Sequence, residues 1–166
     1  MIITIGSKVK DGEGNTYTLT EELGHGGFGC VYKAECEADK SVYAVKTLLY
    51  SFGDEATAAS FKNEVRISSE VSGEHVIRYI YAHDGDEYPE LPPYIIMEYA
   101  EGGTLEDQIE ERKKTNSPYS KEELRNLFLQ LVAGMKSINK KLVHRDIKPE
   151  NILICDGICK ITDFGL

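Results

Sequence analysis

The sequence lacks paired cysteines, long apolar runs and an excess of basic residues. Its four cysteines show no C-x-x-C spacing, so neither a zinc site nor a disulfide framework is indicated. No apolar run approaches the length of a membrane span and no signal peptide is recognisable. Lys and Arg number 19 against 28 Asp and Glu, and the net charge of −9 argues against a nucleic-acid or anionic-membrane surface. We therefore expect a cytoplasmic protein with reduced thiols, no membrane segment and no nucleic-acid partner.

The remaining composition is ordinary for a soluble globular domain. Of 166 residues, 41% are hydrophobic and 28% charged, which is enough to bury a core as a single domain. The polar chemistry is densest in the stretch His144-Arg145-Asp146-Ile147-Lys148-Pro149-Glu150-Asn151. A structural loop that only caps a helix could explain Asp146 or Asn151 singly, but it does not explain both together with the motif that follows.

That second motif is Asp163-Phe164-Gly165, twelve residues past Asn151. The intervening residues 152–162 are typical of a hairpin of two apolar strands that turns at Asp156-Gly157. Such a hairpin brings Asp163 back beside Asn151. Carboxylate and carboxamide oxygens at this position suit a hard divalent cation that is shared with phosphate oxygens, and they favour magnesium over zinc.

The pattern H-R-D-x-K-x-x-N followed by D-F-G resembles the catalytic core of the eukaryotic-type protein kinases. The resemblance implies an α+β two-lobe fold, with a complete five-stranded antiparallel amino-terminal lobe plus one helix and an incomplete helical carboxy-terminal lobe. It also implies ATP and Mg²⁺ as cofactors and a protein substrate with a serine or threonine acceptor, because Lys148 matches the serine/threonine form of the loop. By the same resemblance, Asp146 accepts the substrate proton, Lys148 neutralises the transferring phosphoryl group, and Asn151 and Asp163 hold the metal.

A glycine-rich stretch, Gly24-His25-Gly26-Gly27-Phe28-Gly29-Cys30-Val31, follows a strand expected at residues 17–23. Glycines here let the backbone approach a polyphosphate closely. In dinucleotide-binding proteins such glycines open a helix, whereas residues 31–34 favour a second strand, so a flap over nucleotide phosphates is predicted. A purely structural glycine hairpin is the alternative. The resemblance assigns nucleotide contacts to Leu23, Gly24, Gly26, Gly27, Gly29 and Val31.

The next expected strand, residues 41–47, places Ala44 and Lys46 on one face. Ala44 is small enough to lie over a purine together with Val31, and Lys46 would reach the phosphates. Residues 54–71 favour a helix that resembles the one supplying the kinase ion-pair glutamate, so Glu64 is the predicted partner of Lys46. Ser68 departs from the family pattern, which has a large apolar residue there, and this leaves open how readily the Lys46–Glu64 pair forms.

Two further strands, residues 76–81 and 94–99, complete the predicted sheet. The stretch Met97-Glu98-Tyr99-Ala100-Glu101-Gly102-Gly103 resembles the kinase hinge and precedes a helix-like segment at 104–114. Relatives often carry an acid for the ribose after the hinge glycines; Thr104 stands here, with Asp107 as an alternative. The resemblance adds these nucleotide contacts: Met97, Glu98, Ala100 and Leu153.

The last helix is predicted from a capping box, Ser120-Lys121-Glu122-Glu123, followed by an apolar stripe with helical spacing. We expect this stripe to form one core face. Its members are Leu124, Leu127, Phe128, Leu131, Val132, Met135 and Ile138.

The predicted organisation is an amino-terminal hairpin extension at residues 1–16 and a kinase domain at 17–166. That domain is divided into an amino-terminal lobe at 17–99 and a hinge with a partial carboxy-terminal lobe at 100–166. The family pattern continues beyond Leu166, so we expect this chain to be a fragment that binds ATP weakly, does not phosphorylate peptides and associates through its apolar stripe. Two other functions are alternatives: a pseudokinase-like nucleotide-binding or scaffolding module, and a dinucleotide-dependent oxidoreductase, which rests on the glycines alone.

Overall fold

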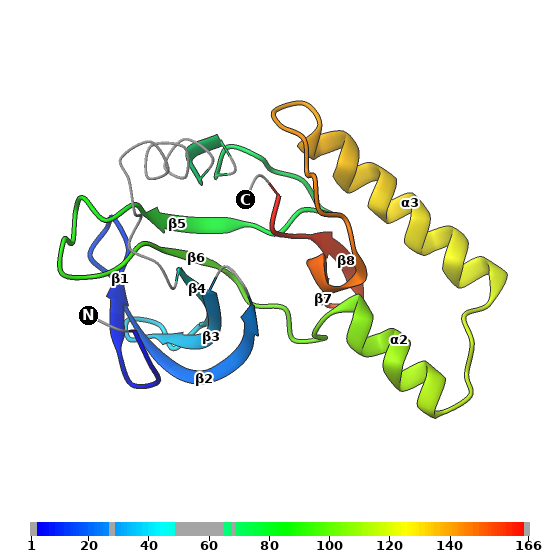
Figure 1. Cartoon of the computed structure of the whole chain (residues 1–166), viewed down its shortest axis with the longest axis horizontal. Helices are drawn as coiled ribbons and strands as arrows, with labels where there is room; N and C mark the ends of the chain where they lie inside the picture. The colour runs from blue at the N-terminus through cyan, green and yellow to red at the C-terminus, as the bar shows by residue number, and fades with distance from the viewer. Residues whose placement is uncertain (1–2, 27–28, 49–64, 68, 165–166) are drawn as a thin grey trace. The chain divides into compact units, whose positions relative to one another are not determined.

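The computed structural model describes residues 3–26, 29–48, 65–67 and 69–164 (Figure 1). The chain divides into two compact units, one of Met1–Ser69 with Tyr79–Tyr99 and one of Glu70–Arg78 with Ala100–Leu166. The strands of the first unit are β1 (Lys8–Lys10), β2 (Thr16–Gly26), β3 (Gly29–Cys36), β4 (Val42–Leu48), β5 (Tyr79–His83) and β6 (Tyr94–Glu98). The second unit contains α2 (Leu105–Lys114), α3 (Lys121–Ile138), the 3₁₀ turn η1 (Pro149–Asn151), β7 (Ile152–Cys155) and β8 (Ile158–Ile161).

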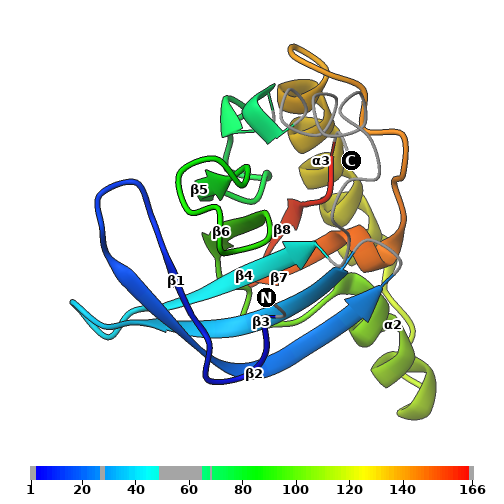
Figure 2. The same ribbon diagram turned by 60° about the vertical axis from the view of Figure 1, so that its left-hand side comes forward.

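The first unit is built on one antiparallel sheet with strand order β1-β2-β3-β4-β6-β5. Figure 2 shows β2, β3 and β4 side by side as a curved sheet. The five predicted strands are present, and β1 from the extension adds a sixth. The strand predicted at 76–81 starts only at Tyr79, because Val76 and Ile77 belong to the second unit and pair there with Ile161.

The core of the first unit lies on one face of this sheet. Burial alternates along β3 as expected for a strand with one covered face. The extension contributes Ile3 and Val9, which are buried with the strands. The tyrosine of β6 fastens the extension as well: the Tyr94 hydroxyl donates to the Lys10 carbonyl oxygen at 2.6 Å. The core residues are Ile3, Val9, Tyr17, Leu19, Cys30, Tyr32, Ala34, Cys36, Val45, Tyr94 and Ile96.

Three predictions lie outside the described residues. Glu64, Ser68 and Gly27 belong to the undescribed positions, so the Lys46–Glu64 pair, the effect of Ser68 and the contact assigned to Gly27 stay predictions. Of the helix predicted at 54–71, residues 65–67 and 69 are helical, whereas Glu70 lies in a turn and Val71 is outside the helix, so the predicted end at residue 71 is too late.

The two helices of the second unit begin as their sequences indicate. Ser120 is the N-cap of α3 and forms the predicted capping box with Glu123. Thr104 caps α2 in the same way, with Asp107 as its partner. Reciprocal caps of this kind satisfy backbone N–H groups that a helix start leaves without an intrahelical acceptor. No helix in the described ranges has the length and apolar character needed to cross a bilayer.

The apolar stripe of α3 is only partly a core face. Ile138 is fully buried, but Leu124, Phe128 and Val132 are 40%, 60% and 64% exposed. The prediction of a core face is therefore wrong for these three exposed residues, Phe128 among them. The buried side of α3 is the one that contains Gly134, which lies against the His75 carbonyl and Ile161. The residues of α3 that pack against the rest of the second unit therefore lie to one side of the predicted stripe. Association through the exposed part of the stripe stays a prediction.

Candidate active site

The sheet of the first unit gathers five of the predicted nucleotide residues on one face. Gly24 lies opposite Val31 and Val31 opposite Lys46, while Ala44 lies opposite Met97. Residues that are directly opposed, or two apart on one strand, project from the same face of a sheet. The opposite face carries the core residues. The shared face therefore carries Gly24, Val31, Ala44, Lys46 and Met97.

The glycine-rich stretch forms the end of a hairpin between β2 and β3. Gly26 and Gly29 are the last paired residues, and strand follows glycine on both sides. The predicted strand–glycine–strand arrangement is confirmed. The dinucleotide-binding alternative is wrong, because β3 stands where that motif requires a helix. Leu23 lies at a register shift between Glu22 and Gly24 in β2. Its apolar side chain is exposed.

In the loop at residues 144–151 of the second unit, the side chains of Asn151 and Lys148 contact Asp146. The Asn151 Nδ2 amide donates to the Asp146 carboxylate at 3.0 Å and to its carbonyl oxygen at 2.8 Å. The Lys148 ammonium lies 3.0 Å from Oδ2 of Asp146. This lysine contact is the main reason that the pKa of Asp146 is lowered, and the same contact raises the pKa of Lys148. The Asp146 carboxylate is thus favoured in its ionised form, and its side chain is about half exposed.

Asn151 and Asp163 are brought together by the β7–β8 hairpin, as predicted. The hairpin turns at Asp156 and Gly157, which both have positive φ (48° and 76°) and match a two-residue Asp-Gly turn. Next to Asp163, the Thr162 N–H donates to the Asn151 carbonyl oxygen at 3.0 Å. This backbone hydrogen bond joins Asn151 to the residue that directly precedes Asp163.

The donor set of this pair fits a magnesium ion. Both Nδ2 hydrogen bonds of Asn151 go to Asp146, which leaves its Oδ1 as the atom able to bind a cation. Asp163 adds a carboxylate. One carboxylate and one carboxamide, with further positions for phosphate and water, form the kind of set that Mg²⁺ uses in phosphoryl-transfer sites.

His144 has a role that the sequence did not reveal. Its ring is buried, with Nδ1 3.2 Å from the Asp146 N–H and Nε2 2.9 Å from the Thr162 carbonyl oxygen. Nδ1 therefore accepts and Nε2 donates. The ring also meets the buried Phe164 edge-on, at 6.3 Å between centroids. His144 connects the loop of Asp146 to the residues beside Asp163; only its place in the motif could have drawn attention to it.

Comparison with known proteins decides the family. The sequence-family model of the protein kinase domain matches residues 17–166 of this chain. This chain belongs to the protein kinase family. It is 36% identical over 157 residues to a serine/threonine-protein kinase of Corynebacterium efficiens, covering 92% of this chain and 29% of the relative. It is 33% identical over 163 residues to the interferon-induced, double-stranded RNA-activated protein kinase of Rattus norvegicus, covering 88% and 30%. The chain thus spans about a third of the length of these relatives.

The remaining residues predicted to contact the nucleotide are divided between the two units. Glu98 lies at the end of β6, and Ala100 follows in the second unit. Leu153 lies in β7, where it forms an isolated bridge with Thr104. The structure therefore assembles the Asp146 loop with Asn151 and Asp163, and separately the glycine hairpin with Lys46 and Met97.

Thr104 and Asp107, the residues considered for a ribose contact, are engaged in helix capping. Asp107 Oδ2 accepts hydrogen bonds from the Thr104 N–H at 2.8 Å and from its hydroxyl at 2.7 Å. The Thr104 hydroxyl in turn accepts from the Asp107 N–H at 3.0 Å. Both side chains are thus committed to starting α2, and a ribose contact from either would compete with the cap.

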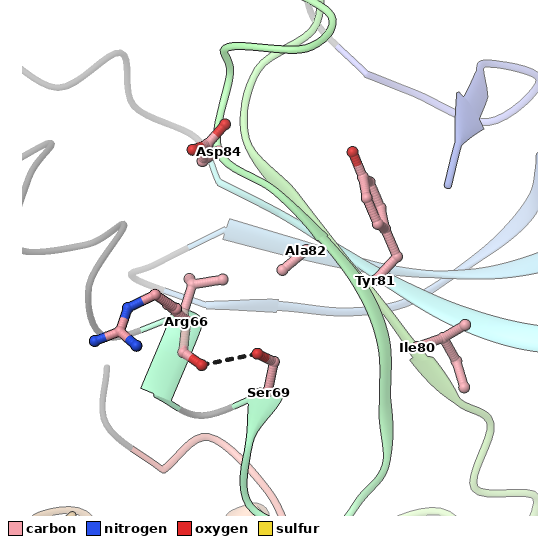
Figure 3. A pocket seen from close by; sticks show the side chains of 7 residues that line it. Arg66, Ser69, Ile80, Tyr81, Ala82 and Asp84 are labelled. Atoms are coloured by element: carbon pink, nitrogen blue, oxygen red, sulfur yellow. Dashed lines mark hydrogen bonds between the residues drawn. The ribbon is translucent and has the colours of Figure 1, made fainter. Parts of the chain in front are cut away.

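A groove of about 570 Å³ lies elsewhere in the first unit, between helical residues near position 66 and β5 (Figure 3). Figure 3 shows Arg66 and Ser69 on one side and Ile80, Tyr81 and Ala82 on the strand side. None of the predicted catalytic or nucleotide residues is among the described residues that line it. These are Val65, Arg66, Ser69, Ile80, Tyr81, Ala82 and Asp84.

Proposed function

We propose that this chain carries the catalytic loop and nucleotide-binding sheet of a serine/threonine protein kinase that transfers the γ-phosphoryl group of ATP to protein hydroxyls. One observation carries the proposal. Asn151 holds Asp146 with its side chain and receives the Thr162 N–H with its backbone, next to Asp163. These contacts support the proposal, because phosphoryl transfer requires the proposed proton acceptor, Asp146, and the proposed cation ligands, Asn151 and Asp163, to be held in one local arrangement.

In the proposed reaction the substrate hydroxyl oxygen forms a bond to the γ-phosphorus while the bond to the ADP oxygen breaks. Asp146 receives the hydroxyl proton. Lys148, which is paired with Asp146 in this structure, supplies positive charge beside the transferring oxygens. Asn151 and Asp163 would hold Mg²⁺, which neutralises phosphate charge when bound. Positioning and electrostatics account for most of the catalysis in this class of reaction.

The nucleotide would be bound by the face that carries Val31, Ala44, Lys46 and Met97. Ala44 and Met97 are buried and apolar, which suits a purine ring, and Lys46 supplies a cation on the same face. A cytoplasmic location is part of the proposal. It is supported by the four cysteines, all of them in described positions, which are buried and form no disulfide.

The test is ATP binding to residues 1–166 with and without magnesium, measured by calorimetry, together with phosphate transfer to serine and threonine peptides. We expect magnesium to strengthen ATP binding, Asp163→Asn to abolish that dependence, and Asp146→Asn to keep the affinity and lose any transfer. Equal magnesium dependence in the wild type and Asp163→Asn contradicts the proposed metal site. Magnesium-dependent binding without transfer in the wild type, also within a longer chain, favours the pseudokinase alternative.

A further inference from the structure

The β7–β8 hairpin is extended on both edges by segments from elsewhere in the second unit. Residues 102–104 add to the outer edge of β7, and residues 75–77 add to the outer edge of β8. Asn151 directly precedes β7, and Asp163 follows β8 by two residues. Any shift of the hairpin therefore moves both predicted cation ligands.

The β7 edge is held by the backbone around Gly102. The Gly102 N–H donates to the Ile154 carbonyl oxygen at 3.0 Å, and the Ile154 N–H donates to the Gly103 carbonyl oxygen at 2.9 Å. The Glu101 carboxylate accepts from the Asp156 N–H at the turn. A Cβ on Gly102 would lie 2.8 Å from Ile154 Cγ2 and 2.9 Å from the Ile154 carbonyl oxygen. Only glycine permits this approach without a shift.

The β8 edge depends on Gly134 of α3 in the same way. The Ile161 N–H donates to the His75 carbonyl oxygen at 3.0 Å, and the Ile77 N–H donates to the Ile161 carbonyl oxygen at 2.9 Å. A Cβ on Gly134 would lie 2.5 Å from the His75 carbonyl oxygen and 2.9 Å from Ile161 Cδ1. Ordinary contact starts at 3.4 Å, so a methyl group displaces the 75–77 segment, β8 or both.

Both edge segments adjoin the points where the chain passes between its two units. These passages follow Ser69, Arg78 and Tyr99. The two segments that pair with the hairpin edges thus belong to the second unit and lie within a few residues of these passages in the chain. We propose that Gly102 and Gly134 are positioning residues that set the placement of Asn151 and Asp163 through the two edges of the hairpin. This inference rests on the proposed function for the role of those two ligands.

The size of the clash at Gly134 is large enough to matter for the placement of the predicted cation ligands. A displacement of about 1 Å at a catalytic group can lower the rate about a hundredfold. The clash at Gly134 is of this size, because it falls short of ordinary contact by 0.9 Å (3.4 minus 2.5). The obstacle there is a backbone carbonyl, which cannot rotate away as a side chain can.

The experiment measures hydrogen exchange of single backbone amides by NMR in the 166-residue chain without nucleotide, in Gly102→Ala and Gly134→Ala. The reporter is the Thr162 N–H, which bonds the Asn151 carbonyl. We expect its exchange to rise about tenfold in each variant, which corresponds to ~1.4 kcal/mol of lost local stability. Gly73→Ala is the matched control, since its Cβ meets the Ser137 hydroxyl at 2.9 Å, a side-chain atom that can turn aside; the Thr162 rate should stay near the wild-type value.

Faster exchange at Ile154 or Ile161 alone, with Thr162 unchanged, overturns the proposal, since the glycines then serve local packing. Should a glycine variant fail to fold, Glu101→Ala decides, because it loosens the β7 edge without a steric clash. Unchanged Thr162 exchange in Glu101→Ala counts equally against the proposal.

A magnesium titration of ATP binding completes the test, with more magnesium needed for half-maximal binding in Gly102→Ala. A wild-type chain that binds no ATP contradicts the proposed function, while the nucleotide-free exchange result still decides the positioning role.

Discussion

Asn151 illustrates how much of this site depends on one side chain. It is buried, and its side-chain amide donates two hydrogen bonds to Asp146, one to the carboxylate and one to the backbone carbonyl oxygen. Its backbone carbonyl receives the Thr162 N–H. The residue thus combines a structural role with the cation-binding role proposed for its Oδ1.

Asn151→Ala should lower both stability and magnesium-dependent ATP affinity. Loss of the two hydrogen bonds costs about 1 kcal/mol, since Asp146 is half exposed and water replaces part of the interaction. Thermal unfolding and calorimetry measure the two effects. Asn151→Asp is the matched comparison: it keeps an oxygen ligand but places a second carboxylate against Asp146. An Ala variant with wild-type stability and magnesium dependence would count against both roles.

The junction of α2 and α3 is an element held by charge and stacking. The Arg112 guanidinium donates to Glu123 Oε1 at 2.5 Å and lies over the Tyr119 ring at 3.9 Å. Glu123 is also the capping-box partner of Ser120. The arginine hydrogen bond is the main cause that lowers the pKa of Glu123 to about 2.

Arg112→Gln should return the pKa of Glu123 toward its ordinary value of 4.5. A carboxylate whose pKa is lowered by folding stabilises the folded state above its unfolded pKa and loses that contribution as pH falls through the folded pKa. The wild-type junction is therefore expected to weaken between pH 4.5 and about 2, and the variant should lose the part of this acid-side dependence that comes from Arg112, while the hydrogen bonds from Ser120 remain. NMR titration of the Glu123 carboxyl measures it, with Lys113→Gln as the control on the same helix; an unchanged titration in Arg112→Gln would rule out the pairing.

At the scale of the whole molecule, the amino-terminal extension is part of the first unit's core. Val9 is fully buried in β1, and the Tyr88 hydroxyl donates to the Asp11 carbonyl oxygen at 3.3 Å from the β5–β6 connection. The turn itself is held by Asp11, whose carboxylate accepts from the Glu13 and Asn15 N–H groups. The extension is therefore hydrogen-bonded to a loop that is distant in the sequence, the connection between β5 and β6.

Val9→Ala should destabilise the first unit by about 2 kcal/mol through lost burial and a residual cavity. For a chain of this length the expected decrease in melting temperature is several degrees, at about 2–4 °C per kcal/mol. Val42→Ala is the matched control, because Val42 is 43% exposed at the start of β4 and should change little. Equal melting temperatures for the two variants would show that the extension is dispensable to the core.

The sequence by itself determined the local features of this protein. The motif residues from His144 to Asn151, the Asp156-Gly157 turn, the glycine hairpin and the Ser120 cap follow from short-range chemistry, and the structure has them where they were expected. Period-two alternation likewise placed Ala44 and Lys46 on one face of a strand. Each of these depends on residues that are close in the chain, so their pattern is readable without knowledge of the fold.

Tertiary structure alone decided the contacts between distant segments. Val76 and Ile77 are apolar and resemble a strand continuing into β5, yet they pair with Ile161, because the backbone groups of the β8 edge need partners. Asp107 is committed to the Thr104 cap, and α3 turns Gly134 to its packed side while Phe128 stays exposed. Propensity and periodicity identify which faces are apolar. They do not say which distant backbone approaches closely enough to require a glycine.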